Sequence, residues 1–313
     1  MITIEQIRTK DNKIIVLGNH ESLIQSILDF DYLSKKKEGS IVGIITGRAG
    51  FAKFFFGRGE ILIPTFVGVD QSFLSQTYNL WFLNLLSGRR TLSSTQELLA
   101  TNFVGGALFA ENVPELHSLK IIDSNDKLIV GPASVGLLVP GVLKLGPIGG
   151  ITPEQILEGK ITHKGSIAVM SASGGMTNEL MSIATLAGHQ LSFALSFGGD
   201  RFPILSPRDA FLLAESDPDT KTVLYYGELG GEDEYELLQL KEEGKFTKNV
   251  IAHIAGTVAS LFAESPQFGH AKAKADKEKV TALAKRSALR RVGFSVSNSF
   301  SEFIELVTNI RSL

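Results

Sequence analysis

Short apolar segments alternate with helical periodicity along the first half of the chain. Five nearly continuous apolar runs are predicted to be strands, at residues 13–18, 40–46, 79–85, 106–110 and 127–130. The segments between them predict helices at 22–30, 93–102 and 114–123. Strands that are apolar along their whole length and alternate with helices indicate a parallel sheet covered on both faces.

The second half repeats this alternation. Strands are predicted at 165–171, 191–197, 221–226, 249–255 and 294–297, and helices at 176–186, 208–216, 232–243, 277–291 and 299–310. Residues 147–153, rich in Pro and Gly, are predicted to form a linker. We therefore expect an α/β fold of two tandem open parallel-sheet domains, at residues 1–152 and 153–313.

Composition and charge narrow the classes of function. The 313 residues are 43% hydrophobic and 20% charged, and the net charge of −2 argues against a general nucleic-acid binder. The absence of cysteine excludes disulfides and thiolate metal sites, and no metal site is predicted. The N-terminus lacks the layout of a signal peptide, and no apolar run approaches the roughly 18 residues of a membrane span. We therefore expect a cytoplasmic protein without a membrane partner.

Glycine-containing turns follow three successive predicted strands of the second half, at Ser173-Gly174-Gly175, Gly198-Gly199-Asp200 and Gly227-Glu228. The carboxyl ends of parallel strands meet at one edge of a sheet, and ligands of open α/β sheets bind there. The first of these turns also opens a predicted helix, whose free N–H groups can stabilise an anion. Each glycine turn taken singly fits simple turn geometry, but together they favour a site.

His270 is the candidate nucleophile at this edge. It lies in a loop with Pro266 and Gly269, rather than inside a periodic apolar segment where a core histidine would lie. An imidazole beside a helix start is suited to carrying a phosphoryl group. Glu228 is the carboxylate best placed to accept the Nδ1–H proton, which would fix the tautomer and leave Nε2 free to attack.

The predicted strand-end loops of the first half, together with the stretch just after the second loop, carry cations able to meet phosphates, namely Arg48, Lys53, Arg58, Arg89 and Arg90. The alternative is that they are solvated surface charges. A second basic stretch, residues 272–291, is predicted to be a solvated helix face. Neither the dinucleotide fingerprint nor the P-loop motif occurs in the chain, so it is not expected to bind ATP unaided by those routes.

Seven motifs in order resemble a known family; they lie at residues 28–32, 59–64, 131–136, 173–179, 198–201, 227–231 and 267–271. The chain resembles the α subunit of succinyl-CoA synthetase. It resembles more closely the matching part of ATP-citrate lyase, also found as the small subunit of citryl-CoA synthetase, in the NDP-forming acyl-CoA synthetase superfamily. The resemblance runs from about Lys13 to the C-terminus, and the motifs at 28–32, 59–64 and 174–175 favour the citrate branch.

The resemblance implies a Rossmann-like CoA-binding domain at 1–152 and a flavodoxin-like CoA-ligase domain at 153–313, which carries a phosphohistidine loop. It implies that His270 is the phosphorylated histidine. The other implied positions are Glu228 and Glu111 for orienting it, Ser173, Gly174 and Gly175 for its phosphate, and Thr46, Gly47, Ser87 and Arg89 for CoA. ATP and Mg²⁺ would lie on a separate ATP-grasp partner that resembles the succinyl-CoA synthetase β subunit, in a hetero-oligomer.

The expected function is that of a subunit of an ATP-dependent citrate–CoA ligase, which forms citryl-CoA through a phosphohistidine and an acyl phosphate. The first alternative is an α-type subunit that acts on succinate or malate. The second is a non-catalytic CoA-binding regulatory subunit, which two departures from the family pattern favour. Ala172 replaces a cation near the anion site, and Lys272 replaces a glycine after the histidine motif. The Lys272 ammonium could compensate for the lost charge if it turns inward.

Overall fold

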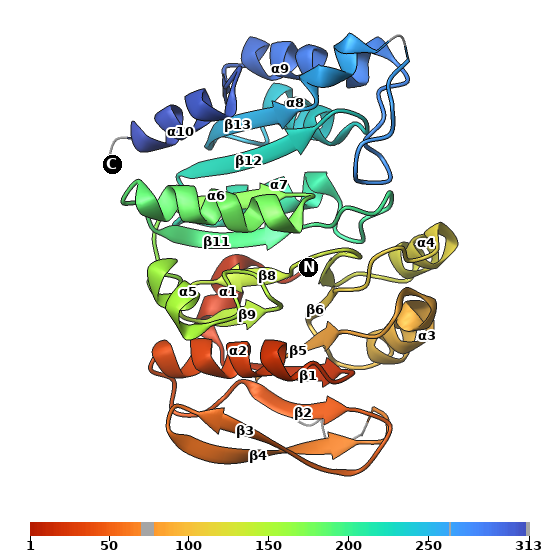
Figure 1. The fold of residues 1–313 in the computed structure, drawn as a ribbon, viewed down its shortest axis with the longest axis vertical. Coiled ribbons are helices and arrows are strands. Elements are labelled where there is room, and N and C mark those ends of the chain that lie inside the picture. The colour runs from red at the N-terminus through yellow and green to blue at the C-terminus, as the bar shows by residue number, and fades with distance from the viewer. Residues whose placement is uncertain (70–77, 263, 311–313) are drawn as a thin grey trace.

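Two seven-stranded sheets with flanking helices form the structure, a computed structural model that describes residues 1–69, 78–262 and 264–310 (Figure 1). Residues 311–313 of the predicted second domain lie outside the described residues. The first sheet has the order β3-β4-β2-β1-β5-β6-β7 and the second the order β14-β13-β12-β10-β11-β8-β9. The predicted α/β class is confirmed.

The first half contains α1 (Ile4–Thr9), β1 (Asn12–Leu17), α2 (Glu21–Leu33), β2 (Ile41–Ile45), β3 (Gly50–Phe56), β4 (Gly59–Phe66), β5 (Asn79–Asn84), α3 (Gly88–Leu99), β6 (Gly105–Leu108), α4 (Glu115–Asp123) and β7 (Leu128–Val130). Next come β8 (Leu137–Val139), β9 (Leu143–Leu145) and α5 (Pro153–Glu158). The remaining elements are β10 (Ile167–Ser171), α6 (Gly174–Leu186), β11 (Leu191–Ser196), α7 (Pro207–Ser216), β12 (Thr222–Glu228), α8 (Asp233–Glu242), β13 (Asn249–Ala255), the 3-10 turns η2 (Thr257–Leu261) and η3 (Glu278–Val280), α9 (Ala282–Arg291), β14 (Ser295–Val296) and α10 (Phe300–Thr308).

Both sheets are mixed, whereas the apolar runs predicted purely parallel ones. In the first sheet β3 pairs antiparallel with β4, and in the second β8 pairs antiparallel with both β11 and β9. β8 and β9 therefore belong to the second sheet although they precede residue 152. Each of these strands has only three residues, which is too short for a periodic pattern of apolar residues. The sequence therefore did not predict them.

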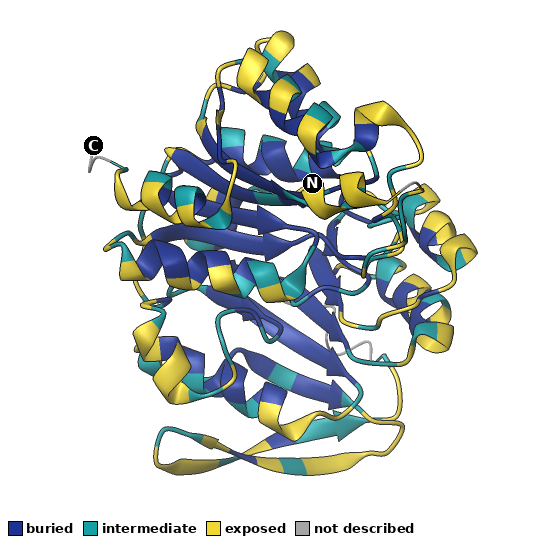
Figure 2. Ribbon diagram, turned by 45° about the horizontal axis from the view of Figure 1, so that its top comes forward, coloured by how far each residue is buried: buried dark blue, intermediate teal, exposed yellow. Residues whose placement is uncertain are grey.

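The central strands are buried along their whole length, as continuous apolar runs require. Every residue of β1, β5, β10 and β11 is buried, and the helices cover the faces of the sheets with their own apolar sides (Figure 2). The arrows of β2, β11 and β12 point to the same side of the molecule, toward α3 and α4 (Figure 1). The loops that carry the candidate residues therefore gather on that side.

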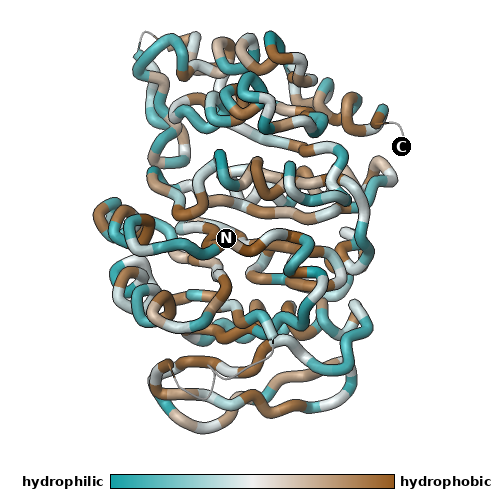
Figure 3. The backbone as a smooth tube through the Cα atoms, turned by 180° about the vertical axis from the view of Figure 1, so that it is seen from behind, coloured by the Kyte–Doolittle hydropathy of each residue, from teal (hydrophilic) through white to brown (hydrophobic). Residues whose placement is uncertain are grey.

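The hairpin β3–β4 lies at the end of the molecule and leaves apolar side chains exposed. Phe51 is 72% exposed and Leu62 is 61% exposed, and Figure 3 shows hydrophobic stretches along this hairpin. Lys53 forms an ion pair with Glu60 within the hairpin at 3.2 Å. Arg58 lies at the hairpin turn, where β4 begins, and therefore at the opposite end of the sheet from the loops after β2 and β5. The prediction that grouped these two cations with the strand-end loops was wrong.

The basic stretch at 272–291 is only partly a solvated face. Its α-helix begins at Ala282, because the Thr281 side chain accepts a hydrogen bond from Ala284 N and caps the helix there. Lys285 and Arg286 are 1% and 5% exposed, so the prediction of a solvated face was wrong for both. Arg286 Nε donates to the Ile254 carbonyl oxygen at 2.9 Å.

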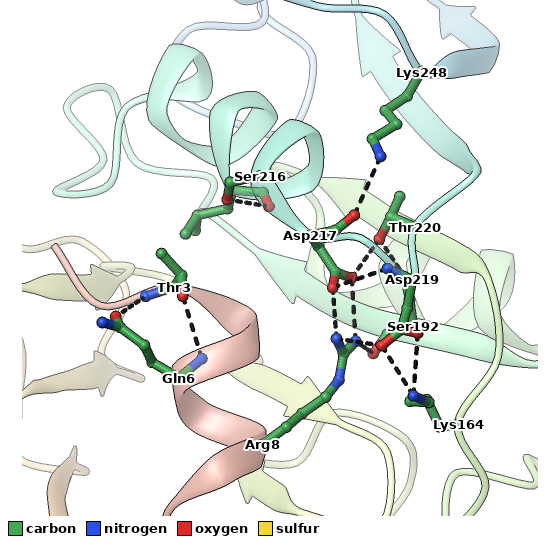
Figure 4. Close-up of polar contacts among 11 residues, drawn as sticks. Thr3, Gln6, Arg8, Lys164, Ser192, Ser216, Asp217, Asp219, Thr220 and Lys248 are labelled. Carbon is green, nitrogen blue, oxygen red and sulfur yellow. Dashed lines mark hydrogen bonds and ion pairs between the residues drawn. The ribbon is translucent and has the colours of Figure 1, made fainter.

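Arg8 of the short helix α1 connects the start of the chain to residues around the second sheet (Figure 4). Arg8 Nη1 lies 2.5 Å from Asp217 Oδ1 and 2.8 Å from Asp219 Oδ2, and Nη2 donates to the Ser192 carbonyl oxygen at 2.9 Å. The Asp217 side chain is fully buried and also accepts from Thr220 Oγ1 at 2.7 Å. The charge of this carboxylate is therefore compensated by one guanidinium and one hydroxyl.

We expect Arg8→Met to destabilise the protein by about 3–5 kcal/mol at pH 7, because it leaves a buried carboxylate unpaired. Burial alone would raise the Asp217 pKa, but hydrogen bonds from Arg8 and Thr220 lower it overall. A lowered folded pKa gives stability that is present above the unfolded value of about 3.9 and is lost as the pH falls through the folded value. Urea unfolding should therefore show a smaller effect of Arg8→Met at pH 3 than at pH 7. Lys10→Met, which changes an exposed cation at the end of the same helix, should change little.

None of the helices within residues 1–69, 78–262 and 264–310 combines the length and the apolar character needed to cross a bilayer.

Candidate active site

His270 and Glu228 meet across two loops of the second sheet. Glu228 is the last residue of β12, and His270 lies in the irregular segment between η2 and η3. His270 Nδ1 donates to Glu228 Oε1 at 2.8 Å, and the two side chains are 29% and 22% exposed. A carboxylate on Nδ1–H selects the tautomer in which Nε2 has a free lone pair, so the ring is set up as a nucleophile through Nε2.

The surroundings of His270 raise its pKa above the ordinary value. The hydrogen bond to Glu228 is the largest cause, and it outweighs burial, which lowers the pKa. The nearby Lys272 ammonium also lowers the pKa and the Asp200 carboxylate raises it. The imidazolium is thus stabilised, and the neutral nucleophilic form becomes abundant only as the pH rises through this raised pKa.

The imidazole lies directly against the backbone of Gly199, in the loop after β11. A Cβ atom at Gly199 would lie 2.4 Å from His270 Cδ2 and 2.7 Å from Nε2. Real Cβ contacts are never this short, so the ring occupies the space that any side chain would need. Glycine at 199 therefore permits close approach of the His270 ring, a role that was not predicted from the sequence.

The start of α6 faces the same cavity as His270. Ser173 caps the helix, its side chain accepting from Met176 N at 3.3 Å, and the first turn of α6 holds no acidic residue. Within the described ranges, no acceptor is found for the N–H groups of Gly174 and Gly175. Both glycines line a cavity of about 330 Å³ together with His270 and Glu111. Two free N–H donors at a helix start, beside an imidazole, make this cavity suited to an anion.

Glu111 comes from the first half of the chain and reaches the cavity on a loop that Asp200 holds. Asp200 Oδ2 accepts from Val113 N at 3.1 Å, and burial raises the Asp200 pKa. Glu111 and Glu228 were both predicted to orient the imidazole. In the part of the chain that the structure describes, Glu228 accepts the hydrogen bond from the His270 ring, while Glu111 lines the cavity wall.

The four residues predicted to contact CoA lie at the same side of the first sheet, on loops after β2 and β5. Thr46 and Gly47 follow β2, whereas Ser87 caps α3 and Arg89 lies in its first turn; all four are exposed. β1 separates the two strands in the sheet. No hydrogen bond or ion pair of the Arg89 guanidinium occurs within residues 1–69, 78–262 and 264–310, which leaves it able to meet an outside anion.

Two loops of the first sheet, after β5 and after β6, touch beside α3. A Cβ atom at Gly88 would lie 3.1 Å from the Asn112 carbonyl oxygen and 3.2 Å from that of Glu111. The start of α3 therefore packs directly on the loop that carries Glu111 into the His270 cavity. A ligand held at the start of α3 would lie next to that cavity.

Lys272 turns inward. Its side chain is 8% exposed, its ammonium forms an ion pair with Asp233 Oδ2, and Nζ lies 5.7 Å from the centre of the Phe197 ring. The side chain shares a small cavity with Ala172 and Ser173, the stretch in which the sequence lacks a cation. The charge of the ammonium is paired there with that of Asp233.

The contacts of several charged residues around the site were not predicted from the sequence, namely those of Asp200, Asp233, Glu234 and Lys285. A usable signal was present for Lys285, because the buried positions of α9, namely 282, 285, 286 and 289, follow the spacing of one helix face. No sequence pattern pointed to the contacts of the two aspartates, which depend on how loops from different strands meet. No cluster of three or more His, Asp or Glu side chains able to hold a metal occurs among the described residues.

Comparisons with known proteins show what the chain is similar to. A family model described as CoA-ligase matches residues 170–294. The ATP-citrate synthase beta chain protein 1 of Arabidopsis thaliana is 38% identical over 288 residues, which are 90% of this chain and 47% of that protein. Human ATP-citrate synthase is 34% identical over 308 residues, which are 96% of this chain and 28% of that protein. The chain spans half or less of the length of its curated relatives, from 28% to 50%.

Solved structures give the same picture. ATP citrate lyase from Methanothrix soehngenii, in complex with citrate and coenzyme A, matches with a TM-score of 0.91 at 37% identity, over 95% of this chain and 49% of that chain. The dinucleotide forming acetyl-coenzyme A synthetase 1 of Ca. Korarchaeum cryptofilum matches with a TM-score of 0.67 at 16% identity, over 96% of this chain and 61% of that chain. At that identity the second match concerns the fold alone.

Proposed function

We propose that this chain is the CoA-ligase subunit of an ATP-dependent citrate–CoA ligase, since it is 38% identical to a plant ATP-citrate synthase beta chain and a CoA-ligase family model matches residues 170–294. The observation that carries the proposal is the position of His270, between the Glu228 carboxylate and the free N–H groups at the start of α6. This arrangement supplies a nucleophile, a group that orients it and donors for the charge that it would carry.

In the proposed reaction, Nε2 of neutral His270 attacks the terminal phosphorus of ATP, so a nitrogen–phosphorus bond forms and ADP leaves. Glu228 holds the remaining proton at Nδ1 throughout, and the N–H groups of Gly174 and Gly175 receive the phosphoryl oxygens. A citrate carboxylate oxygen then takes the phosphoryl group, which returns His270 to its neutral form. The thiolate of CoA attacks the resulting acyl carbon and phosphate leaves, so no step expels hydroxide from a carboxylate.

We assign the two halves of the chain different parts of this work. The proposed CoA-binding domain is residues 1–152, with Thr46, Gly47, Ser87 and Arg89 around CoA. The proposed ligase domain is residues 153–313, with the phosphohistidine loop. The contact between Gly88 and the Glu111 loop supports the placement of CoA, because that loop lines the His270 cavity and a CoA held at α3 would lie close to it. ATP and Mg²⁺ would be bound by an ATP-grasp partner in a cytoplasmic hetero-oligomer.

A reconstitution experiment tests the proposed function. The purified chain should form no acyl-CoA from ATP, citrate and CoA, because it lacks the two nucleotide-binding motifs noted above. Addition of an ATP-grasp partner should produce citryl-CoA, measured by chromatography, in preference to succinyl-CoA or malyl-CoA. Turnover by the chain alone would refute the need for a partner. Turnover only with succinate or malate would refute the citrate assignment.

We expect Arg89→Ala to weaken CoA binding by about 10- to 100-fold, because a charge-assisted contact to a phosphate contributes roughly 1.5–3 kcal/mol. Isothermal titration calorimetry with CoA measures this directly. The matched control is Arg58→Ala, since Arg58 is also exposed but lies at the opposite end of the first sheet. If Arg89→Ala and the wild-type chain bind CoA with equal affinity, Arg89 is a solvated surface charge and not a CoA contact.

A further inference from the structure

Glu228 ends β12, and the loop that follows it contacts the segment that contains His270. Gly230 and Gly231 in this loop have φ angles of +78° and +57°, which favour glycine. A Cβ atom at Gly230 would lie 2.0 Å from the Lys272 carbonyl oxygen, so the backbones of the two loops are in direct contact. A shift of this loop would therefore move both the Glu228 carboxylate and the segment that carries the His270 ring.

The Lys285 side chain binds the backbone of this loop. Its Nζ donates to the Glu228 carbonyl oxygen at 2.7 Å and to the Gly230 carbonyl oxygen, and lies 2.6 Å from Glu234 Oε2. The two carbonyl oxygens accept hydrogen bonds from the ammonium, and the Glu234 carboxylate compensates its charge as an ion pair. The Lys285 side chain is 1% exposed, so water has little access to replace it.

The Glu234 carboxylate is fixed in turn by the strand that precedes the loop. Tyr225 Oη donates to Glu234 Oε1 at 3.2 Å, and both side chains are buried. A Cβ atom at Gly227 would lie 2.0 Å from Glu234 Oε1, so the carboxylate packs directly on the backbone of β12. The ammonium is thereby held between the end of β12, the start of α8 and α9.

We propose that Lys285 is a positioning residue for the His270 site: its buried ammonium fixes the backbone at Glu228 and Gly230 so that the Glu228 carboxylate meets Nδ1 of His270. Its part in phosphoryl transfer rests on the proposed function. Lys285 touches neither substrate nor the reacting atoms and acts through Glu228. Without the ammonium, two carbonyl groups lose their donor and the loop is free to shift.

The test measures the His270 ring itself, by NMR titration of the full chain labelled with ¹⁵N-histidine. In the wild-type chain the Nδ1–H tautomer should dominate, with a pKa above about 6.5 because of the Glu228 hydrogen bond. In Lys285→Met the pKa should fall and the tautomer preference should weaken. Phosphoryl incorporation from ATP with the partner should fall by about 10- to 100-fold, the usual cost of a displaced catalytic group.

Two further variants separate positioning from general stability. Arg286→Met removes the neighbouring buried cation of α9, which binds the Ile254 carbonyl and does not contact the loop. It should leave the His270 titration unchanged. Lys285→Met alone leaves the Glu234 carboxylate buried without its ion-pair partner, which can prevent folding. The double variant Lys285→Met/Glu234→Gln removes both charges, and the His270 titration is measured on it if the single variant does not fold. Lys285→Arg keeps a cation and should restore part of the titration shift.

An unchanged His270 pKa and tautomer in a folded Lys285→Met or double variant would overturn the proposal. An equal change in Arg286→Met would overturn it too, since the effect would then be one of stability. The titration needs neither ATP nor a partner. If the wild-type chain shows the expected titration but never accepts phosphate from ATP with an active partner, the proposed function fails and the positioning role of Lys285 is still decided by the titration.

Discussion

His270→Ala is expected to abolish phosphoryl incorporation from ATP, with a loss of more than about 1,000-fold, because removal of a covalent nucleophile costs several powers of ten. The wild-type chain with an ATP-grasp partner should take up acid-labile label from γ-labelled ATP. The matched control is His163→Ala, because His163 is exposed and outside the site. Label that persists in His270→Ala would move the nucleophile to another residue. A wild-type chain that never takes label with an active partner would instead favour the non-catalytic subunit.

The same experiment has a defined pH dependence. Only neutral His270 can attack, and the Glu228 hydrogen bond raises the pKa of the ring. The rate of labelling should therefore increase as the pH rises through a value above about 6.5, the ordinary pKa of histidine. Replacement of Glu228 by Gln should shift this increase to lower pH, because the largest cause of the raised pKa is removed. The contribution of His270 to the free energy of unfolding has the opposite pH dependence. It is present at low pH and is lost as the pH rises through the folded pKa of the ring.

Gly199→Ala is expected to reduce labelling by about 100-fold while the fold persists. The added Cβ would lie 2.4 Å from His270 Cδ2, so the ring must move, and a displacement of about 1 Å at a reacting group costs on this order. The Gly199 backbone does not have a φ angle in the left-handed region, so alanine brings no backbone strain there. The loss should therefore lie in activity rather than in the melting temperature.

Gly59→Ala is the matched control for this substitution. Gly59 lies at the start of β4, and its nearest neighbour to an added Cβ is the Phe56 carbonyl oxygen at 3.6 Å, an ordinary contact. It should label like the wild-type chain. Normal labelling by Gly199→Ala would mean that the ring can move freely without loss of function, and would remove Gly199 from the site.

The sequence predicted the elements whose signal is local. The apolar runs around Ile15 and Val169 predicted central strands, and Ser173 followed by two glycines predicted the start of α6. The pairing of His270 with Glu228 was also predicted, because both follow strands that end at one sheet edge. These predictions succeed because strand burial, helix caps and the common edge of parallel strands follow from residue type and chain order alone.

Contacts that depend on tertiary packing could not be predicted in this way. The space that Gly199 leaves for the His270 ring arises only when two loops from different strands meet. The direction of the Lys272 side chain was open in the sequence, and the structure turns it toward Asp233. The Lys272 side chain lines the same small cavity as Ala172, and its charge there is paired with that of Asp233.

The pairing of β8 with β11 has a consequence for any attempt to separate the two halves of the chain. A fragment that begins at residue 153 would contain β10 to β14 but would lack β8 and β9. In the intact chain, Ala194 and Leu195 pair with Leu138 and Leu137. In the fragment, their backbone N–H and C=O groups would lack these partners. Such an open, apolar border is a template for intermolecular pairing, so the severed ligase half would tend to self-associate.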